Sequence, residues 1–351
     1  MSFHPKPHRA KELRGVWMAT VNNADWPSRK DLTVEQQKQE LTAILDRVAA
    51  LHLNAVFLQV RPMADAFYPS HLEPWSEFLT GTIGKDPGYD PLAFAIAEAH
   101  ARGLELHAWF NPFRGNPTTT LRAYPYGRFL WMDPGDPAVR QRALDVIADV
   151  TRRYDIDGVH LDDYFYPYPE NNQDFPDGAT YQQYGAGMSK DAWRRDNINR
   201  FVENLYSTVK SIKPAVEVGI SPFGIWRPGH PSQIKGFDAY DKLYADSKLW
   251  LHRGWVDYLA PQLYWPIDKR EQSFPALLHW WTREDKLGRG IVAGMSLNRV
   301  SRVGANELAR QIRLVREDDR AVGFILFSAH TIVRDTGGVD DVLRRAVDGR
   351  L

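Results

Sequence analysis

The chain contains no cysteine among its 351 residues, which excludes disulfides, thiolate metal sites and a cysteine nucleophile together. It also lacks an excess of either charge, because 44 Lys and Arg residues balance 44 Asp and Glu residues. A protein without a basic field has little of the phosphate attraction on which nucleic-acid binding depends. We therefore expect no nucleic-acid partner.

Long apolar runs are absent as well. A membrane-spanning helix needs roughly 18 or more consecutive apolar residues, and no segment reaches that length, so we expect no transmembrane segment. Residues 1–9 lack the apolar core of a signal peptide. The chain as it stands is therefore typical either of a protein that stays inside the cell or of one whose signal sequence has been removed.

Aromatic residues, in contrast, are abundant, with 12 Trp, 15 Tyr and 16 Phe. Some of them stand among proline and polar residues rather than in apolar runs, as in Tyr264-Trp265-Pro266 and around Trp226. The apolar C–H faces of sugars stack on flat aromatic rings, so this excess favours a carbohydrate ligand.

Short β-prone runs alternate with amphipathic helical patterns along the whole chain. The predicted strands cover residues 14–20, 55–61, 104–111, 158–164, 216–221, 256–264, 290–296 and 323–328. Eight alternations predict parallel βαβ units that close into an α/β fold, the (β/α)8 TIM barrel. A doubly wound open sheet is the alternative, but no glycine-rich phosphate loop follows the first strand.

We expect one domain. Residues 1–12 are predicted to form a flexible N-terminal tail and residues 13–351 a catalytic barrel. The loops after the second, fourth and fifth strands are long, and long loops on the C-terminal face are where such barrels build their sites.

The run from Gly158 to Pro167 is the most informative stretch, because a buried strand ends there in two adjacent carboxylates followed by aromatic residues. Side chains alternate along a strand, which places His160 low in the barrel and Asp162 at its mouth. At least six strands carry hydrogen-bonding groups at this same end. The predicted substrate-binding residues are Gln59, Arg61, His107, Trp109, Asn111, Tyr164, Ser221, Trp226, Gln262, Tyr264 and Trp265.

Asp162 is the first choice for a catalytic carboxylate, and Asp163 is the second. Asp65 and Glu73, in the loop after the second strand, are further catalytic candidates, although Asp65 could instead cap a turn and Glu73 could instead shape its loop. Adjacent aspartates repel each other, so one of them should have a raised pKa unless Arg61 or a histidine compensates.

Several blocks of the sequence resemble the bacterial family 10-like glycosyl hydrolases. The match runs from about residue 14 to residue 328, nearly the whole chain. The blocks that carry it are residues 14–17, Gln59-Val60-Arg61-Pro62, residues 68–70, 73–76, 79–81 and 87–92, His107-Ala108-Trp109-Phe110-Asn111-Pro112, Asp162-Asp163-Tyr164-Phe165-Tyr166-Pro167, residues 221–226 and residues 260–266.

The resemblance implies a (β/α)8 barrel and glycosidase activity in the bacterial envelope, with the glycan strands of peptidoglycan as the favoured substrate. Many members carry a signal or a lipoprotein anchor, so the resemblance implies a cell-envelope or secreted protein. The resemblance does not fix the second catalytic carboxylate.

The residues and the resemblance together predict a glycosidase that uses carboxylate acid/base chemistry, without cofactor or metal. If the sugar carries an N-acetyl group, that group could act as the nucleophile, oriented by Tyr264. One alternative is a metal-dependent polysaccharide deacetylase built on His107, His160, Asp162 and His330, although no motif such as His-Glu-x-x-His is present. The other is a non-catalytic carbohydrate-binding barrel.

Overall fold

The computed structural model describes residues 11–171, 173–185, 187–297, 305–335 and 338–347. Its centre is a closed barrel of parallel strands in the order β1-β11-β10-β9-β8-β7-β3-β2. These strands are β1 (Leu13–Met18), β2 (Ala55–Arg61), β3 (Glu105–Phe110), β7 (Gly158–Leu161), β8 (Glu217–Ile220), β9 (Tyr258–Leu259), β10 (Ile291–Ser296) and β11 (Ala321–Phe327). The predicted TIM barrel is confirmed. The predicted tail falls almost wholly on residues 1–10, outside the described residues, and stays a prediction.

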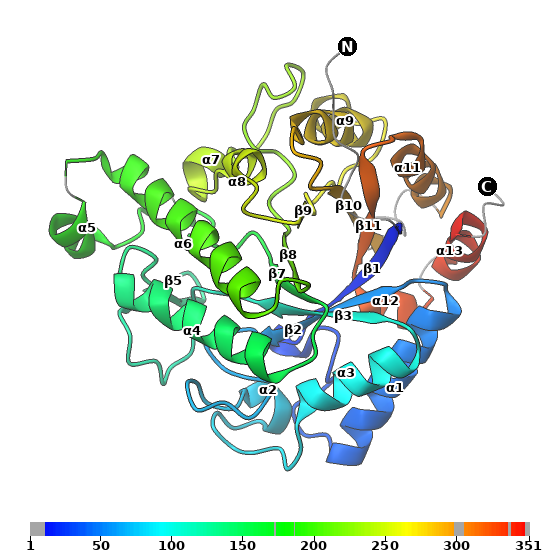
Figure 1. Ribbon diagram of the computed structural model, residues 1–351, viewed down its shortest axis with the longest axis horizontal. Coiled ribbons are helices and arrows are strands. Elements are labelled where there is room, and N and C mark those ends of the chain that lie inside the picture. Colours follow the sequence, from blue (N-terminus) through cyan, green and yellow to red (C-terminus); the bar gives the residue numbers. More distant parts are fainter. Residues whose placement is uncertain (1–10, 172, 186, 298–304, 336–337, 348–351) are drawn as a thin grey trace.

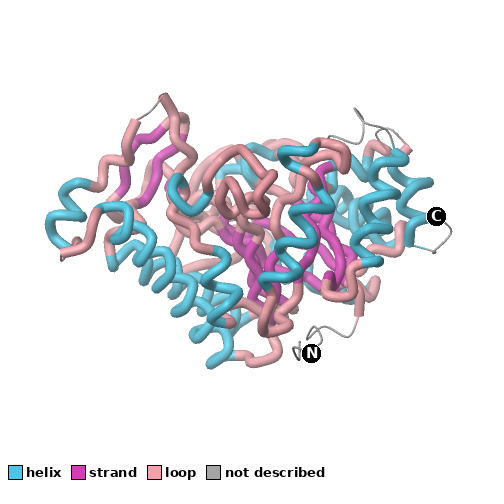
Figure 2. The backbone as a smooth tube through the Cα atoms, turned by 90° about the horizontal axis from the view of Figure 1, so that it is seen from above, coloured by secondary structure: helices cyan, strands magenta, loops and turns pink. Residues whose placement is uncertain are grey.

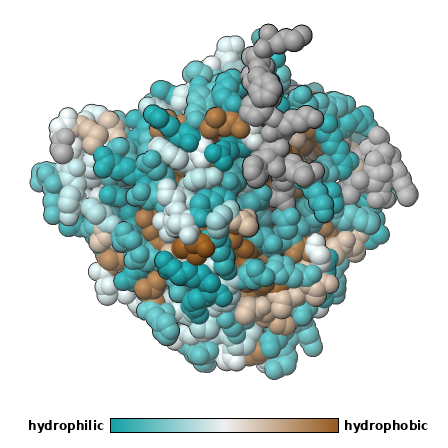
Figure 3. All heavy atoms as spheres, viewed as in Figure 1, coloured by the Kyte–Doolittle hydropathy of each residue, from teal (hydrophilic) through white to brown (hydrophobic). Residues whose placement is uncertain are grey.

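Helices surround the barrel as a ring, and α5 projects at the far left of Figure 1. They are α1 (Val34–Ala50), α2 (Glu77–Thr80), α3 (Pro91–Ala101), α4 (Pro137–Arg153), α5 (Gly178–Tyr184), α6 (Lys190–Ile212), α7 (Ala239–Lys242), α8 (Ser247–Arg253), α9 (Phe274–Glu284), α11 (Ala305–Glu317), α12 (Ala329–Val333) and α13 (Val339–Val347), with short 3-10 turns η1 (Val21–Asn23) and η2 (Arg270–Gln272). None of the described helices is long and apolar enough to cross a membrane. The face shown in Figure 3 is mostly hydrophilic, with hydrophobic residues in small groups.

Local capping explains where the main helices begin. Thr33 and Gln36 form a reciprocal capping box at the start of α1, which satisfies two backbone N–H groups that have no partner inside the helix. Asp90 and Asp136 cap α3 and α4, each directly before a proline that suits the first helical position.

Strand alternation divides the core into two layers. Val159 and Leu161 belong to the large cluster between strands and helices, as expected. Trp17, Phe57 and Trp109 belong to a separate cluster inside the barrel. The alternation predicted for the strands is therefore the one observed, and it decides which residues can reach the barrel axis.

A directional chain of hydrogen bonds runs through the lower part of the barrel. The indole Nε1 of Trp17 can only donate, so Nε2 of His160 accepts from it, at 3.0 Å. His160 Nδ1 must then carry the proton that it donates to the Tyr258 hydroxyl, also at 3.0 Å. The Tyr258 hydroxyl donates in turn to Nδ1 of His107, at 3.2 Å. Burial lowers the pKa of His160 well below its usual value, in keeping with a neutral ring.

Two departures from the predicted elements matter for the site. A small three-stranded sheet of β4 (Arg114–Gly115), β5 (Ala123–Tyr126) and β6 (Phe129–Met132) follows β3 and lies beside the barrel, at the upper left of Figure 2. The sequence did not indicate it. The predicted sixth strand is shorter than expected, because Pro261 has no N–H for the ladder and only isolated bridges form at Gln262, to Phe223 and to Gly294.

Glycines make room for the aromatic rings inside the barrel. A Cβ at Gly219 would collide with the ring of Tyr258, and one at Gly158 would collide with His107. We expect Gly219→Ala to lower the free energy of unfolding by about 2 kcal/mol, because an extra methyl group in a filled core displaces its neighbours. Urea unfolding measures this loss.

Gly178 provides a matched control, since no heavy atom lies within 4 Å of a Cβ built there. Gly178→Ala should leave the unfolding midpoint unchanged or slightly raised. Equal effects of the two substitutions would contradict the close packing around Tyr258.

Candidate active site

The barrel opens at the carboxyl ends of its strands into a cavity of about 330 Å³. Eight of the predicted site residues line it: Gln59, Trp109, Asp162, Asp163, Tyr164, Ser221, Gln262 and Tyr264. They come from the ends of β2, β3, β7, β8 and the segment after β9, so strands far apart in the sequence converge on one site.

Asp162 is fixed by three hydrogen-bond donors. Its Oδ2 accepts from Trp109 Nε1 at 3.1 Å and from Asn111 Nδ2 at 2.6 Å, and its Oδ1 accepts from the backbone N–H of Tyr164 at 3.0 Å. The residue is only 7% exposed. Donors on both oxygens stabilise the ionised form and hold the carboxylate in one orientation.

The amide of Asn111 is oriented by a relay that begins at the backbone. The N–H groups of Thr20 and Val21 both donate to Oε1 of Gln59, at 2.9 Å each. Gln59 must therefore turn its Nε2 toward Oδ1 of Asn111, and Asn111 must turn its Nδ2 toward Asp162. Since backbone N–H groups cannot reverse, the relay presents a donor to Asp162 at all times.

Asp163 has different partners. Gln262 Nε2 donates to its Oδ1 at 2.8 Å, and the hydroxyl of Tyr168 is hydrogen-bonded to its Oδ2. Gln262 also donates to the carbonyl of Ser221 at 3.2 Å, which fixes the amide against the end of β8. Asp163 is 4% exposed, so both aspartates are buried and have little contact with water.

Burial and proximity raise the pKa of both carboxyl groups. Desolvation raises the pKa of Asp162 to about 6, with the neighbouring charge of Asp163 as the second cause, while Arg114 and the hydrogen bonds act in the opposite direction. Desolvation is also the main cause that raises the pKa of Asp163. Such a pair can hold one proton and one negative charge near neutral pH, which is the state that acid/base chemistry requires.

Three predicted residues of the second strand and its loop lie outside the cavity. Arg61 is fully buried, donates through Nε to Glu73 at 2.7 Å and through Nη1 to two backbone carbonyl groups. Its ion-pair partner is therefore Glu73 and neither of the aspartates that follow β7. Asp65 accepts from the backbone N–H of Met63 at 2.7 Å and shapes the loop. The structure brings neither Glu73 nor Asp65 to the mouth.

Four other predicted residues do not line the cavity. His107 lies at the opposite, N-terminal end of the barrel, within 3.3 Å of Glu105, so it cannot reach a ligand at the mouth. Asn111 lies beneath Asp162 and acts on it directly. Trp226 stacks on Trp280 outside the barrel, and Trp265 packs against Phe223 in the core. Of the two neighbours Tyr264 and Trp265, which both follow the end of β9, only Tyr264 lines the cavity.

The alternative metal site is not assembled. His160 uses both ring nitrogens in the barrel interior, His107 lies at the N-terminal end, and His330 is exposed. Among the described residues, the group of possible metal ligands that the structure does bring together is Glu105, His107 and Glu217, at the end of the barrel opposite the cavity.

Sequence reasoning missed several cavity residues, above all Arg114 in β4, Arg128 in the β5–β6 turn and Tyr168. Arg114 follows the end of β3 by only four residues, which was the available signal. Tyr168 could not be found by strand periodicity, because it lies in an irregular loop whose path depends on distant partners.

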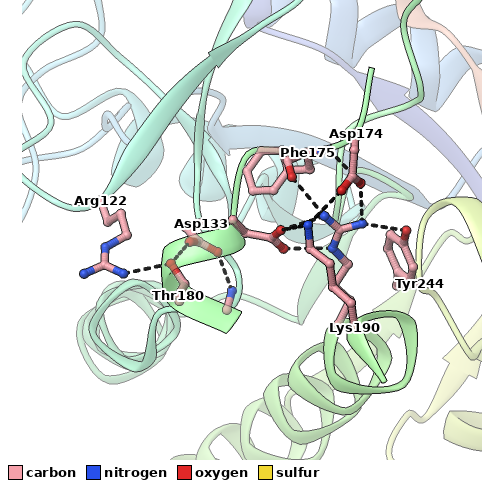
Figure 4. A network of polar contacts seen from close by, with 10 residues as sticks. Arg122, Asp133, Asp174, Phe175, Thr180, Lys190 and Tyr244 are labelled. Atoms are coloured by element: carbon pink, nitrogen blue, oxygen red, sulfur yellow. Dashed lines mark hydrogen bonds and ion pairs between the residues drawn. The ribbon is translucent and has the colours of Figure 1, made fainter. Parts of the chain in front are cut away.

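Arg194 on α6 anchors that loop. All five of its N–H groups donate, to both oxygens of Asp177, to Asp174, to the carbonyl of Phe175 and to the hydroxyl of Tyr244. Figure 4 shows this network around Asp174, Phe175 and Tyr244. A larger cavity of about 570 Å³ lies beside Arg194, but the N–H donors of Arg194 are already used by its partners within the protein. The mouth cavity is therefore the better candidate site.

The carboxyl pair makes a titration prediction. The 13C signal of the Asp162 carboxyl should titrate near pH 6, and Asp163→Asn should lower that pKa toward its ordinary value, because the like charge is removed. Since both pKa values are raised above those of the unfolded chain, the pair costs folding free energy above about pH 6, and this cost disappears as the pH falls toward 4. Two ordinary carboxyl titrations would contradict the burial of the pair.

The Arg61–Glu73 pair makes a stability prediction. Glu73→Gln leaves a fully buried guanidinium without its counter-ion, so the free energy of unfolding should fall by about 3 kcal/mol. Asp196→Asn is the matched control, since it breaks an exposed helical pair with Arg200 and should change little. Denaturant titrations compare the two. If both substitutions change the free energy of unfolding by the same small amount, Glu73 does not stabilise the fold.

Comparisons with known proteins agree with this architecture. The glycosyl hydrolase YngK of Bacillus subtilis is 44% identical over 362 aligned residues, which cover 95% of this chain and 71% of YngK. The glycosyl hydrolase DigH of Escherichia coli K12 is 38% identical over 307 residues, 78% of this chain and 70% of DigH. The solved glycoside hydrolase domain of PgaB (BpsB) from Bordetella bronchiseptica shares the fold, with a TM-score of 0.63 at 16% identity over 96% of this chain and 98% of that domain.

The family model described as Glycosyl hydrolase-like 10 matches residues 12–309. The resemblance predicted from the sequence is thereby confirmed, and the chain belongs to the glycosyl hydrolase-like 10 family.

Proposed function

We propose that this protein hydrolyses glycosidic bonds in a polymer of N-acetylated amino sugars, with the glycan strands of peptidoglycan in the bacterial cell envelope as its substrate. The observation that carries the proposal is the pair Asp162 and Asp163 in a cavity whose walls are aromatic. Membership of a glycosyl hydrolase-like family and relatives named as glycosyl hydrolases support the reaction class.

The cavity suits a sugar ring. Rings of Trp17, Trp109, Tyr164 and Tyr264 line it and offer flat apolar faces, while the amides of Gln59 and Gln262 offer polar groups at its edge. The hydroxyl of Ser221 is buried and hydrogen-bonds to no group in the described part of the chain, so it is available to a ligand.

The carboxylates suggest how the bond is broken. Among the described residues, the carboxylates that line the cavity are Asp162 and Asp163 alone, and they are adjacent. Ordinary hydrolysis uses two carboxylates on either side of the bond, whereas substrate-assisted hydrolysis uses the acetamido group of the sugar as the nucleophile. A single adjacent pair fits the second route, in which one carboxylate holds the acetamido group and the other donates a proton.

The donor pattern assigns the two roles. Asp162, with three fixed donors and a relay that cannot reverse, stays ionised and accepts from the acetamido N–H. In the complex with substrate, Asp163 carries the proton that it gives to the departing oxygen. The acetamido oxygen attacks C1 as Asp163 protonates the departing oxygen; water then adds to C1 and returns its proton to Asp163. Tyr264 lines the same cavity, and in this mechanism its hydroxyl holds the acetamido oxygen.

The test incubates the purified protein, with and without chelator, with peptidoglycan sacculi, peptide-stripped glycan strands and chitin oligosaccharides. New reducing ends and their masses should appear and should be insensitive to chelator. Asp162→Asn and Asp163→Asn should each lower kcat by about 100-fold or more, as expected for a lost catalytic group. The rate should also fall below about pH 6, where Asp162 becomes protonated.

Asp268→Asn is the matched control, because Asp268 is an exposed aspartate outside the cavity; it should retain full activity. A thiazoline analogue of N-acetylglucosamine should inhibit competitively if the acetamido group is the nucleophile. Release of acetyl groups, or loss of activity with chelator, would instead support a deacetylase, and binding without any product would support a lectin-like barrel.

A further inference from the structure

Two arginines of the cavity have no role in the chemistry described above. Arg114 and Arg128 both line the cavity that holds Asp162 and Asp163. Every other charged side chain of that lining is one of the two aspartates. No carboxylate of the described residues lies within ion-pair distance of either guanidinium, in contrast to the buried pair of Arg61 and Glu73.

Arg114 is held rigidly between two aromatic rings. Its guanidinium carbon lies 4.9 Å from the ring centre of Phe129 and 4.7 Å from that of Tyr164. The planar group is therefore fixed in orientation, and its N–H donors at the edge remain for polar partners. Nη1 donates to the carbonyl of Pro62 at 3.3 Å, a long contact.

The donors of Arg114 are incompletely used. Its Nε is buried and has no hydrogen-bond partner among the described residues. The residue is only 4% exposed. A cation in such a place loses hydration, and the charges of Asp162 and Asp163 act on it only from beyond ion-pair distance. An anionic ligand in direct contact would therefore restore part of the lost interaction.

Arg128 is the second positively charged residue of the cavity wall, and it lies nearer to solvent than Arg114. It is exposed, and its guanidinium carbon lies 4.8 Å from the centre of the Phe129 ring. One aromatic ring thus supports both guanidinium groups, one buried and one on the rim. Both guanidinium groups line one cavity, and arginine binds a carboxylate through paired N–H donors.

We propose that Arg114 and Arg128 form a subsite for a carboxylate carried by a sugar unit of the substrate. This inference rests on the proposed function, since it concerns the same cavity. It adds that the substrate carries a negative charge. Such a carboxylate occurs on the lactyl ether of muramic acid and on uronic acids. The subsite would bind either, and the geometry of the attached sugar would decide between them.

The experiment compares acidic and neutral forms of one substrate. Peptide-stripped glycan strands are used as prepared and after reduction of their carboxyl groups to alcohols, and oligosaccharides of alternating N-acetylglucosamine and glucuronate test the uronic source. For the wild type, kcat/KM should be about tenfold higher for the acidic strands than for the reduced strands. Higher salt should shrink this ratio, because Arg128 is exposed.

Arg128→Gln should reduce the preference for the acidic strands severalfold, chiefly through KM, and Arg114→Gln should abolish it. Because Arg114 is packed between rings, its variant is checked for folding by circular dichroism; if it does not fold, Arg128→Gln decides. Arg253→Gln is the matched control, since Arg253 is exposed on the last turn of α8, which leads to the opposite end of the barrel. It should keep the wild-type ratio.

Equal kcat/KM for acidic and reduced strands in the wild type would overturn the subsite and leave the hydrolase intact. An unchanged ratio in both arginine variants would overturn it as well. If the wild type cleaves no glycan at all, the proposed function fails, and the subsite is then judged by calorimetry. Tighter binding of acidic strands, lost in Arg128→Gln, would support it, and equal binding would reject it.

Discussion

The burial of two adjacent carboxyl groups, Asp162 and Asp163, is the constraint around which the mouth of this barrel is built. A buried negative charge is unfavourable unless donors are fixed around it. The protein supplies them from opposite sides, through Asn111 for one aspartate and Gln262 for the other. Because the relay through Gln59 begins at backbone N–H groups, its direction is set by the fold and does not depend on pH.

The lower half of the barrel isolates this pair from the N-terminal face. Trp17 lines the cavity with its ring and donates downward to His160, so the chain through Tyr258 and His107 begins directly beneath the site. Both ring nitrogens of His160 are used within that chain and burial lowers its pKa, so this ring supplies no positive charge to the aspartates. The cation that lowers the pKa of Asp162 is Arg114 in the small sheet, so the sheet that the sequence did not indicate becomes part of the site.

Strand periodicity correctly predicted which side chains face the barrel axis. It placed Trp109, Asp162 and Tyr264 on the axis because alternate residues of a strand share a face. It also placed His160 low in the barrel and Asp162 at the mouth, but it grouped His107 with the residues of the mouth although His107 lies in register with Gly158 at the start of β7. It also could not identify partners from loops: Glu73 for Arg61, or Tyr168 for Asp163. Those contacts depend on loop paths set by distant residues such as Arg194.

Arg61 and Arg114 are two buried arginines whose functions differ because their interaction partners differ. Both follow or end a strand on the C-terminal side of the barrel, both are buried, and both donate to the backbone of a neighbouring loop. Arg61 has Glu73 as counter-ion, so its charge is satisfied within the fold and it stabilises the loop after β2. Arg114 has rings on two sides and a donor without a partner. Asp162 and Asp163 act on this charge only from beyond ion-pair distance, and a ligand can enter beside it. We therefore assign Arg114 to substrate recognition and Arg61 to stability.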